Sequence, residues 1–133
     1  MYNHPKVRLM IVDDIANVRR DLKTVLLIAG SAAGMDIEIT AEARDGMDAI
    51  RLARSNLPDV ILMDLEMPVM DGFSATRIIK EQLPSTKIIA LTVHGDAQSR
   101  EEAYRAGVDH YIEKGAPVNE IVRAIQMLEK KEG

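Results

Sequence analysis

Short apolar runs rich in β-branched residues recur along the chain, and longer stretches with a different spacing separate them. A run of this length, bounded by turn residues and continuously apolar, is typical of a buried strand. The pattern therefore predicts five strands, at Val7–Val12, Ile37–Ala41, Val60–Met63, Lys87–Leu91 and Val108–Ile112.

The intervening stretches carry apolar residues at three- and four-residue steps, which predicts amphipathic helices. In the first helix the apolar stripe consists of Ile15, Val18, Leu22, Val25 and Leu26. In the fifth helix one face carries Val118, Ile121, Val122, Ile125 and Leu128. We expect both faces to pack on the sheet.

Residues that favour the start of a helix indicate where the second to fifth helices begin. Asp45, Asp71 and Asp96 precede the second, third and fourth helices, where aspartate is a favoured N-cap residue, and Pro117 suits the start of the fifth. The fourth helix, AQSREEAYRAG, offers only alanines and Tyr104 as apolar contacts. Because so little apolar surface holds it, we expect this helix to be mobile.

Strands that alternate with helices predict an α/β fold: a five-stranded parallel sheet covered on both faces by right-handed crossovers, in a three-layer (βα)5 sandwich. We expect one domain over residues 7–130, with residues 1–6 as a tail. In such sheets ligands bind beyond the carboxyl ends of the strands, where the strand order reverses. The search for function therefore begins at those ends.

Composition adds limits to this picture. Aromatic residues make up only 3% of the 133 residues, so the core must be aliphatic, and the absence of cysteine excludes disulfides and cysteine-based zinc sites. A net charge of −4 gives nucleic-acid binding no electrostatic support. Neither a signal peptide nor an apolar stretch of the ~20 residues that span a bilayer is evident, so we expect a cytoplasmic protein with no membrane partner.

Polar residues gather where the predicted strands end. Asp13 and Asp14 follow the first strand, Asp64 the third, Thr92 the fourth and Lys114 the fifth. Each has an ordinary explanation when taken alone: a helix cap, a turn hydroxyl or a solvated lysine. If the first and third strands are neighbours, however, three carboxylates meet and repel one another.

A hard divalent cation relieves such repulsion, because Mg²⁺ prefers carboxylate, carbonyl and water oxygens. The cluster therefore predicts a magnesium site formed by Asp13, Asp14 and Asp64, with Lys114 as a second positive charge. A carboxylate can also act as a nucleophile toward a phosphoryl group. We expect Asp64 to be that nucleophile, with Lys114 and the Thr92 hydroxyl binding the transferred oxygens.

At these residues the sequence closely resembles the receiver domain of two-component response regulators. The stretches that carry the resemblance are LMIVDD, DVILMDLEMPVMDG, IIALT and AGVDHYIEKGAP, and it extends from about Val7 to Leu128. It implies a flavodoxin-like sheet ordered 2-1-3-4-5. The KGA stretch is similar to receivers that precede LuxR-type DNA-binding domains, and we expect no such output domain within the 133 residues.

The resemblance also implies roles for individual residues. Asp64 matches the phosphoacceptor, Asp13 and Asp14 match the acidic pair of the metal site, and Glu66 stands where a backbone carbonyl binds the metal. By resemblance, then, the cofactor is Mg²⁺.

The family's switch mechanism places Thr92 and Lys114 on the phosphoryl group. Thr92 then moves toward that group and Tyr111 rotates inward from an exposed position, which alters the surface of the fourth helix, fifth strand and fifth helix. Two residues depart from the family pattern. Val93 replaces a small residue and is expected to narrow access to Asp64, and Gly115 replaces a proline, which rules out a cis-proline turn.

The implied partners are a sensor histidine kinase or phosphotransfer protein, a downstream effector or fused DNA-binding domain, and a second copy in a phosphorylation-dependent homodimer. The domain would be a regulatory phosphoacceptor and not an enzyme, apart from catalysing its own phosphotransfer and dephosphorylation.

Two alternatives stay open. One is a receiver-like interaction module that works without phosphorylation. The other is a haloacid-dehalogenase-type phosphatase, which also uses an aspartate nucleophile and Mg²⁺. That enzyme class has its nucleophile in an Asp-x-Asp pattern after the first strand, whereas this chain has Asp13-Asp14-Ile15 there and no room for a cap domain.

Overall fold

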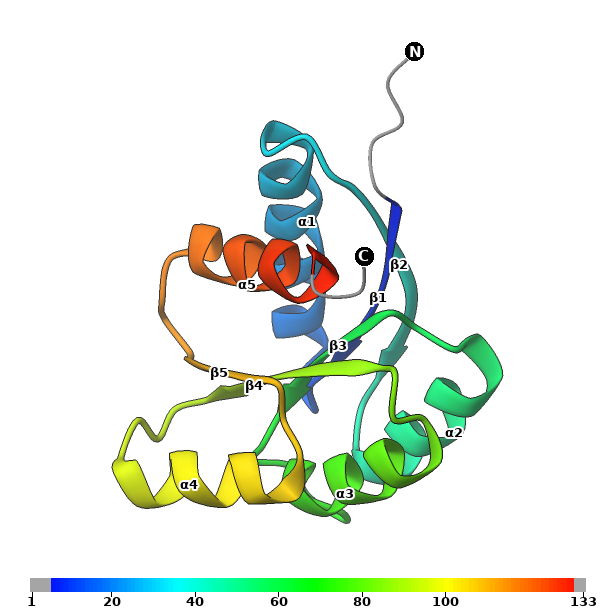
Figure 1. Cartoon of the computed structure of the whole chain (residues 1–133), viewed down its shortest axis with the longest axis vertical. Helices are drawn as coiled ribbons and strands as arrows, with labels where there is room; N and C mark the ends of the chain where they lie inside the picture. The colour runs from blue at the N-terminus through cyan, green and yellow to red at the C-terminus, as the bar shows by residue number, and fades with distance from the viewer. Residues whose placement is uncertain (1–5, 131–133) are drawn as a thin grey trace.

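A computed structural model describes residues 6–130 and contains five strands and five helices in strict alternation (Figure 1). The strands are β1 (Lys6–Val12), β2 (Asp36–Ala43), β3 (Val60–Asp64), β4 (Lys87–Thr92) and β5 (His110–Glu113). The helices are α1 (Ala16–Ala32), α2 (Gly46–Asn56), α3 (Gly72–Gln82), α4 (Ala97–Ala106) and α5 (Val118–Lys130). The sheet is parallel with the order β2-β1-β3-β4-β5, which confirms the predicted fold class. Of the predicted tail, residues 1–5 lie outside the described residues, and Lys6 begins β1.

The predicted start of β5 is wrong, because the strand begins at His110 and not at Val108. Gly107 ends α4 in the left-handed conformation with φ 115°. The N–H of Val108 then donates to the Ala103 carbonyl at 3.2 Å. The end of the helix therefore uses a backbone group that the apolar pattern had assigned to the strand.

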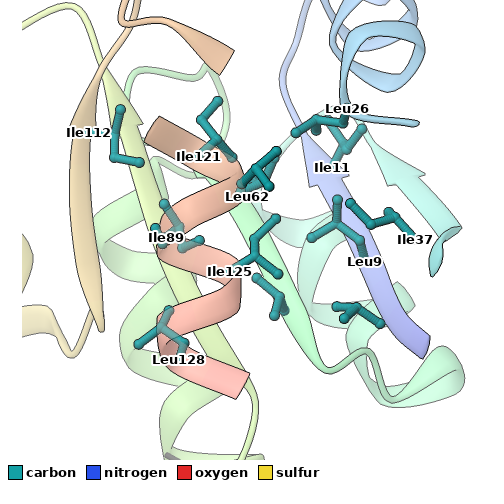
Figure 2. Packing of buried hydrophobic residues seen from close by; sticks show 14 of the residues in the cluster. Leu9, Ile11, Leu26, Ile37, Leu62, Ile89, Ile112, Ile121, Ile125 and Leu128 are labelled. Carbon is teal, nitrogen blue, oxygen red and sulfur yellow. The ribbon is translucent and has the colours of Figure 1, made fainter. Parts of the chain in front are cut away.

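Two apolar layers sandwich the sheet. Helices α1 and α5 cover one face, and α2, α3 and α4 cover the other (Figure 1). On the first face, Ile125 of α5 lies among Leu62 and Ile89 of the central strands (Figure 2). All three are fully buried, and each such side chain contributes about 1.5–3 kcal/mol relative to exposure. The α5 prediction is confirmed for Ile121, Val122, Ile125 and Leu128, which are buried, and Val118 is partly buried against them.

The predicted apolar stripe of α1 is only partly buried. Leu26 and Gly30 are its buried residues, whereas Ile15, Val18 and Val25 are 53%, 38% and 42% exposed. Gly30 allows the last turns to approach the sheet, since an added Cβ would lie 2.5 Å from Cδ1 of Ile37. Earlier in the helix, Leu22 packs partly buried against the core. Val18, Leu22 and Val25 line an open cavity together with Val118 and Ile121 of α5, so the stripe faces α5 without being fully covered.

The helix caps follow the sequence, with one exception. Asp45, Asp71 and Asp96 each accept a hydrogen bond from the N–H three residues further on, at 2.8, 2.8 and 3.1 Å. In α1 the N-cap residue is Ile15 and no side chain caps the helix, so Asp14 does not have that structural role. Helix α4 buries only Ala103 and Ala106, which confirms its weak apolar attachment, and its mobility stays a prediction.

At the amino ends of the strands, two aspartates bind neighbouring backbone. Asp59 accepts the Arg8 N–H at 2.9 Å, and Asp109 accepts the Ile88 N–H at 2.9 Å and the Lys80 ammonium at 3.0 Å. Both carboxylates therefore satisfy groups of the fold itself.

Candidate functional site

The carboxylates predicted to meet do so at the carboxyl end of the sheet. Strands β1 and β3 are hydrogen-bonded neighbours, with Val12 opposite Met63, so Asp13 and Asp64 leave the sheet side by side. Asp13, Asp14 and Asp64 each offer a carboxylate oxygen, and these oxygens lie within 4.8 Å of one another. Asp13 and Asp64 are only 3% and 1% exposed, whereas Asp14 is exposed. Two charges are thus nearly removed from water and the third faces it.

Local backbone fixes the two buried carboxylates. The N–H two residues further on donates to each of them: Ile15 to Asp13 at 2.9 Å, and Glu66 to Asp64 at 3.0 Å. The loop after β3 folds back tightly at Gly72, whose added Cβ would lie 2.3 Å from the Asp64 carbonyl oxygen. Only glycine allows this close return, which explains the DG pair that opens α3.

Lys114 provides the positive charge of the cluster. Its ammonium lies 3.2 Å from Asp64 and 3.3 Å from Asp13. The backbone holds it there, because the Lys114 N–H donates to the Thr92 carbonyl at 2.7 Å. The next residue, Gly115, has φ 95°, a conformation closed to proline, so the departure from the family pattern at this position changes the backbone itself.

The negative charge of the buried Asp64 carboxylate is only partly offset by the groups around it. Burial raises the pKa of Asp64 to about 6, and the Asp13 carboxylate adds to this, while the Glu66 N–H and Lys114 act against it. For Lys114, burial alone would lower the pKa, but Asp64 and Asp13 outweigh it and the pKa lies above its ordinary value. The carboxylates therefore still carry an excess of negative charge after Lys114 has paired with them.

The donor set fits a hard divalent cation. Two buried carboxylates and one exposed carboxylate converge within a single coordination sphere, and their ligand atoms are oxygens of the kind that Mg²⁺ prefers. The exposed position of Asp14 leaves room for water, which Mg²⁺ usually retains among its ligands.

The Glu66 carboxylate, from the loop after β3, is a further negative group at the site, and it contacts the end of β4. The Thr92 hydroxyl donates to Oε2 of Glu66 at 2.7 Å, and the Val93 N–H donates to Oε1 at 3.0 Å. The metal-binding role that the resemblance implies for Glu66 concerns its backbone carbonyl, whereas these two contacts of its side chain join residues 26 and 27 positions apart in the chain. The Val93 side chain itself is 63% exposed.

The expected exposed starting position of Tyr111 is wrong for this structure. Its ring is 8% exposed and belongs to the core beneath α4. The hydroxyl donates to the His94 carbonyl, and the Arg100 guanidinium lies 5.6 Å from the ring centroid. Burial raises the pKa of the Tyr111 hydroxyl. The ring is therefore already inward without any phosphoryl group.

Along residues 6–130, none of the helices combines the length and apolar character that crossing a membrane requires.

Comparison with known sequences gives consistent matches. A family model for the response regulator receiver domain matches residues 9–126. The uncharacterized transcriptional regulatory protein YxjL of Bacillus subtilis (strain 168) is 37% identical over 124 residues, which cover 93% of this chain and 55% of that protein. Response regulator UvrY of Escherichia coli (strain K12) is 37% identical over 121 residues, 90% of this chain and 53% of that protein. The chain spans about half the length of the curated relatives it matches.

Solved structures give the same result. The signal receiver domain of a NarL response regulator from Mycobacterium tuberculosis superposes with a TM-score of 0.84 at 28% identity, covering 95% of this chain and 98% of that one. A two-component response regulator of the LuxR family from Aurantimonas sp. SI85-9A1 has a TM-score of 0.82 at 32% identity, covering 94% and 86%.

Proposed function

The chain belongs to the response regulator receiver domain family, and from that premise we propose that Asp64 accepts a phosphoryl group in a Mg²⁺-dependent reaction. The observation that carries the proposal is the buried Asp64 carboxylate, with Asp13 and the Lys114 ammonium directly beside it. Such an arrangement orients a nucleophile and supplies charge for the group it receives.

In the proposed step an Asp64 oxygen forms a new P–O bond. The P–N bond of a phosphohistidine donor breaks, and its electron pair remains on the imidazole nitrogen. No group is oxidised or reduced. Lys114 stabilises oxygens of the transferring group by its charge, and the buried setting of Asp64 limits competing water.

Asp13, Asp14 and Asp64 would hold the metal, with the Glu66 backbone carbonyl as a further ligand. When bound, Mg²⁺ neutralises charge on the transferring phosphoryl group. Asp13 and Asp64 are pre-positioned for this by the N–H groups of Ile15 and Glu66.

The signal would be a shift between two arrangements of the switch residues. A phosphoryl group on Asp64 brings strong acceptor oxygens close to Thr92, and Tyr111 is linked to the same loop through the His94 carbonyl. Because Tyr111 is inward already, phosphorylation would stabilise this arrangement and would not have to create it. The affected surface is formed by α4, β5 and α5.

For partners, we propose a sensor histidine kinase or phosphotransfer protein as the phosphodonor, acting in the cytoplasm. Ile15 and Val18, exposed at the start of α1, lie close in sequence to Asp13 and Asp14 and offer apolar surface to such a donor. A homodimer through the α4-β5-α5 surface, and a DNA-binding output as in LuxR-type relatives, belong to the same proposal.

The test uses intact-mass measurement after incubation with Mg²⁺ and acetyl phosphate. We expect a single acid-labile phosphoryl adduct in the wild-type protein, and none in Asp64→Asn. The matched control is Asp59→Asn at the other end of the same strand, which should still be labelled.

Other outcomes decide against the proposal. Continuous release of phosphate from several phosphomonoesters would indicate a phosphatase. A wild-type protein that is neither labelled nor bound by fluoroberyllate, a phosphoryl analogue, would indicate an interaction module that works without phosphorylation.

A further inference from the structure

Glu66 binds the end of β4 through both oxygens of its side chain. One accepts the Thr92 hydroxyl at 2.7 Å and the other the Val93 N–H at 3.0 Å. Thr92 is 1% exposed and Glu66 is half-buried, so the bond to the Thr92 hydroxyl is partly shielded from water, whereas the bond to the Val93 N–H is exposed. Hydrogen bonds to an ionised acceptor are about twice as strong as neutral ones. The two donors at the end of β4 therefore already hold an anion.

The same two donors lie next to the proposed phosphoacceptor. Asp64 pairs with Leu91 in the β3–β4 register, so Thr92 and Val93 are the next residues along the neighbouring strand. The Glu66 N–H donates to the Asp64 carboxylate at 3.0 Å, which places the backbone of Glu66 against that carboxylate as well. A phosphoryl group on Asp64 would bring three acceptor oxygens into this region.

We infer that the Glu66 carboxylate is an internal competitor of the phosphoryl group for the Thr92 hydroxyl and the Val93 N–H. The inference rests on the proposed function. Before phosphorylation Glu66 satisfies both donors, and a phosphoryl oxygen gains them only when this carboxylate is displaced. Glu66 is thus a positioning residue that weakens the binding of a phosphoryl-like ligand at Asp64.

The contact also reaches the switch tyrosine. The His94 N–H donates to the Thr92 hydroxyl oxygen at 3.0 Å, and the His94 carbonyl accepts the Tyr111 hydroxyl. Glu66 therefore fixes the loop that holds Tyr111 inward when no phosphoryl group is present. Its carboxylate stands in for the anion that would otherwise order this loop.

Titration with fluoroberyllate in the presence of Mg²⁺, followed by NMR, tests the inference. We expect Glu66→Ala to bind the analogue about tenfold more tightly than the wild type, because one set of charge-assisted hydrogen bonds no longer has to be broken. Glu66→Gln should lie between the two, since its single carbonyl oxygen replaces only one of the two acceptors.

The matched control is Glu113→Gln. Glu113 is an exposed carboxylate opposite Thr92 in the β4–β5 register, so this change removes a nearby charge without removing an acceptor of Thr92 or Val93. It should leave the affinity nearly unchanged. A second readout needs neither ligand nor metal: in Glu66→Ala the Val93 amide resonance should shift and its hydrogen exchange should accelerate, and in Glu113→Gln neither should occur.

Equal or weaker binding by Glu66→Ala than by the wild type would overturn the inference, and so would an equal gain in Glu113→Gln, which would indicate general charge repulsion. If no variant and no wild-type protein bound the analogue, the proposed function would fall. An unchanged Val93 amide in metal-free Glu66→Ala would instead refute the contact itself.

Discussion

The two ends of β3 carry the same residue type in opposite circumstances. At the amino end, the Asp59 carboxylate accepts the Arg8 N–H of the neighbouring strand at 2.9 Å. At the carboxyl end, Asp64 shares its surroundings with Asp13, and burial raises its pKa to about 6. Asp59 thus links two strands by a hydrogen bond. The negative charge of Asp64 is only partly compensated by the groups around it.

Asp109 repeats the amino-end arrangement on another strand, where it binds the Ile88 N–H and Lys80. A carboxylate that accepts hydrogen bonds from its own fold contributes stability. A buried carboxylate beside a second one reduces stability until an external cation arrives. The amino end of the sheet therefore stabilises the fold, whereas the carboxyl end holds charge that a bound cation would neutralise.

The backbone shows the same contrast. Val69, in the loop after β3 at the carboxyl end, has φ 69° and is 84% exposed. Leu57, which ends α2 before β3, has φ 49°. A β-branched side chain tolerates this conformation less well than leucine, so the larger strain lies beside the site.

The largest expected effect comes from the amino end. Asp109→Ala should reduce the free energy of unfolding by about 3 kcal/mol, because the buried Ile88 N–H and the Lys80 ammonium both lose an acceptor. Urea denaturation measures this. Asp14→Ala, at the exposed edge of the acidic cluster, is the control and should cost far less. Comparable losses in the two variants would erase the distinction between the two ends.

The second largest effect is a gain in the free energy of unfolding. Without metal, Asp64→Asn should raise the free energy of unfolding by about 2 kcal/mol above roughly pH 8, because the ionised form of Asp64 is disfavoured in the folded protein. The folded pKa of about 6 lies above the ordinary aspartate pKa of 3.8, so the wild type loses stability as the pH rises from 3.8 to 6. Below that interval Asp64 is protonated in both states, and the two proteins should unfold alike. The loss of one partner of Lys114 reduces the gain.

Magnesium should reduce that difference in stability between the two proteins. At roughly ten times its dissociation constant, Mg²⁺ should stabilise the wild-type protein by about 1.4 kcal/mol. Asp64→Asn should gain less, because one ligand has lost its charge. A metal-free Asp64→Asn protein less stable than the wild type at every pH would show that the carboxyl end is not strained electrostatically.

The smallest effect concerns the backbone. Val69→Gly should stabilise the protein by about 1 kcal/mol, since the relief of strain at φ 69° exceeds the entropy that glycine adds to the unfolded chain. Leu57→Gly, at the amino end, should be nearly neutral. Thermal unfolding of the two variants measures both changes in stability. A loss of stability in Val69→Gly would exclude strain at that loop.

The sequence was sufficient for much of this molecule. The runs of apolar residues located the five strands to within about two residues, and Asp45, Asp71 and Asp96 marked the starts of three helices. These features depend on residues near one another in the chain, which is where periodicity and capping act.

The incomplete burial of the α1 stripe and the inward position of Tyr111 did not follow from the sequence. A 3.6-residue period identifies an apolar stripe but does not say how completely another layer covers it, so it does not predict that Ile15, Val18 and Val25 stay partly exposed. Likewise, the ring of a strand aromatic can lie inward or outward, and in Tyr111 the hydrogen bond to the His94 carbonyl accompanies the inward position.

The alternation of strands and helices and the residue types at the strand ends could thus be predicted from the sequence alone. That β1 lies beside β3, that Lys114 reaches an aspartate 101 residues away, and that Glu66 binds Thr92 became evident only in the folded chain. The two kinds of feature differ in the sequence separation over which their causes act. Backbone propensity and hydrophobic period act over a few residues, whereas the meeting of charges distant in the chain depends on how the strands are ordered in space.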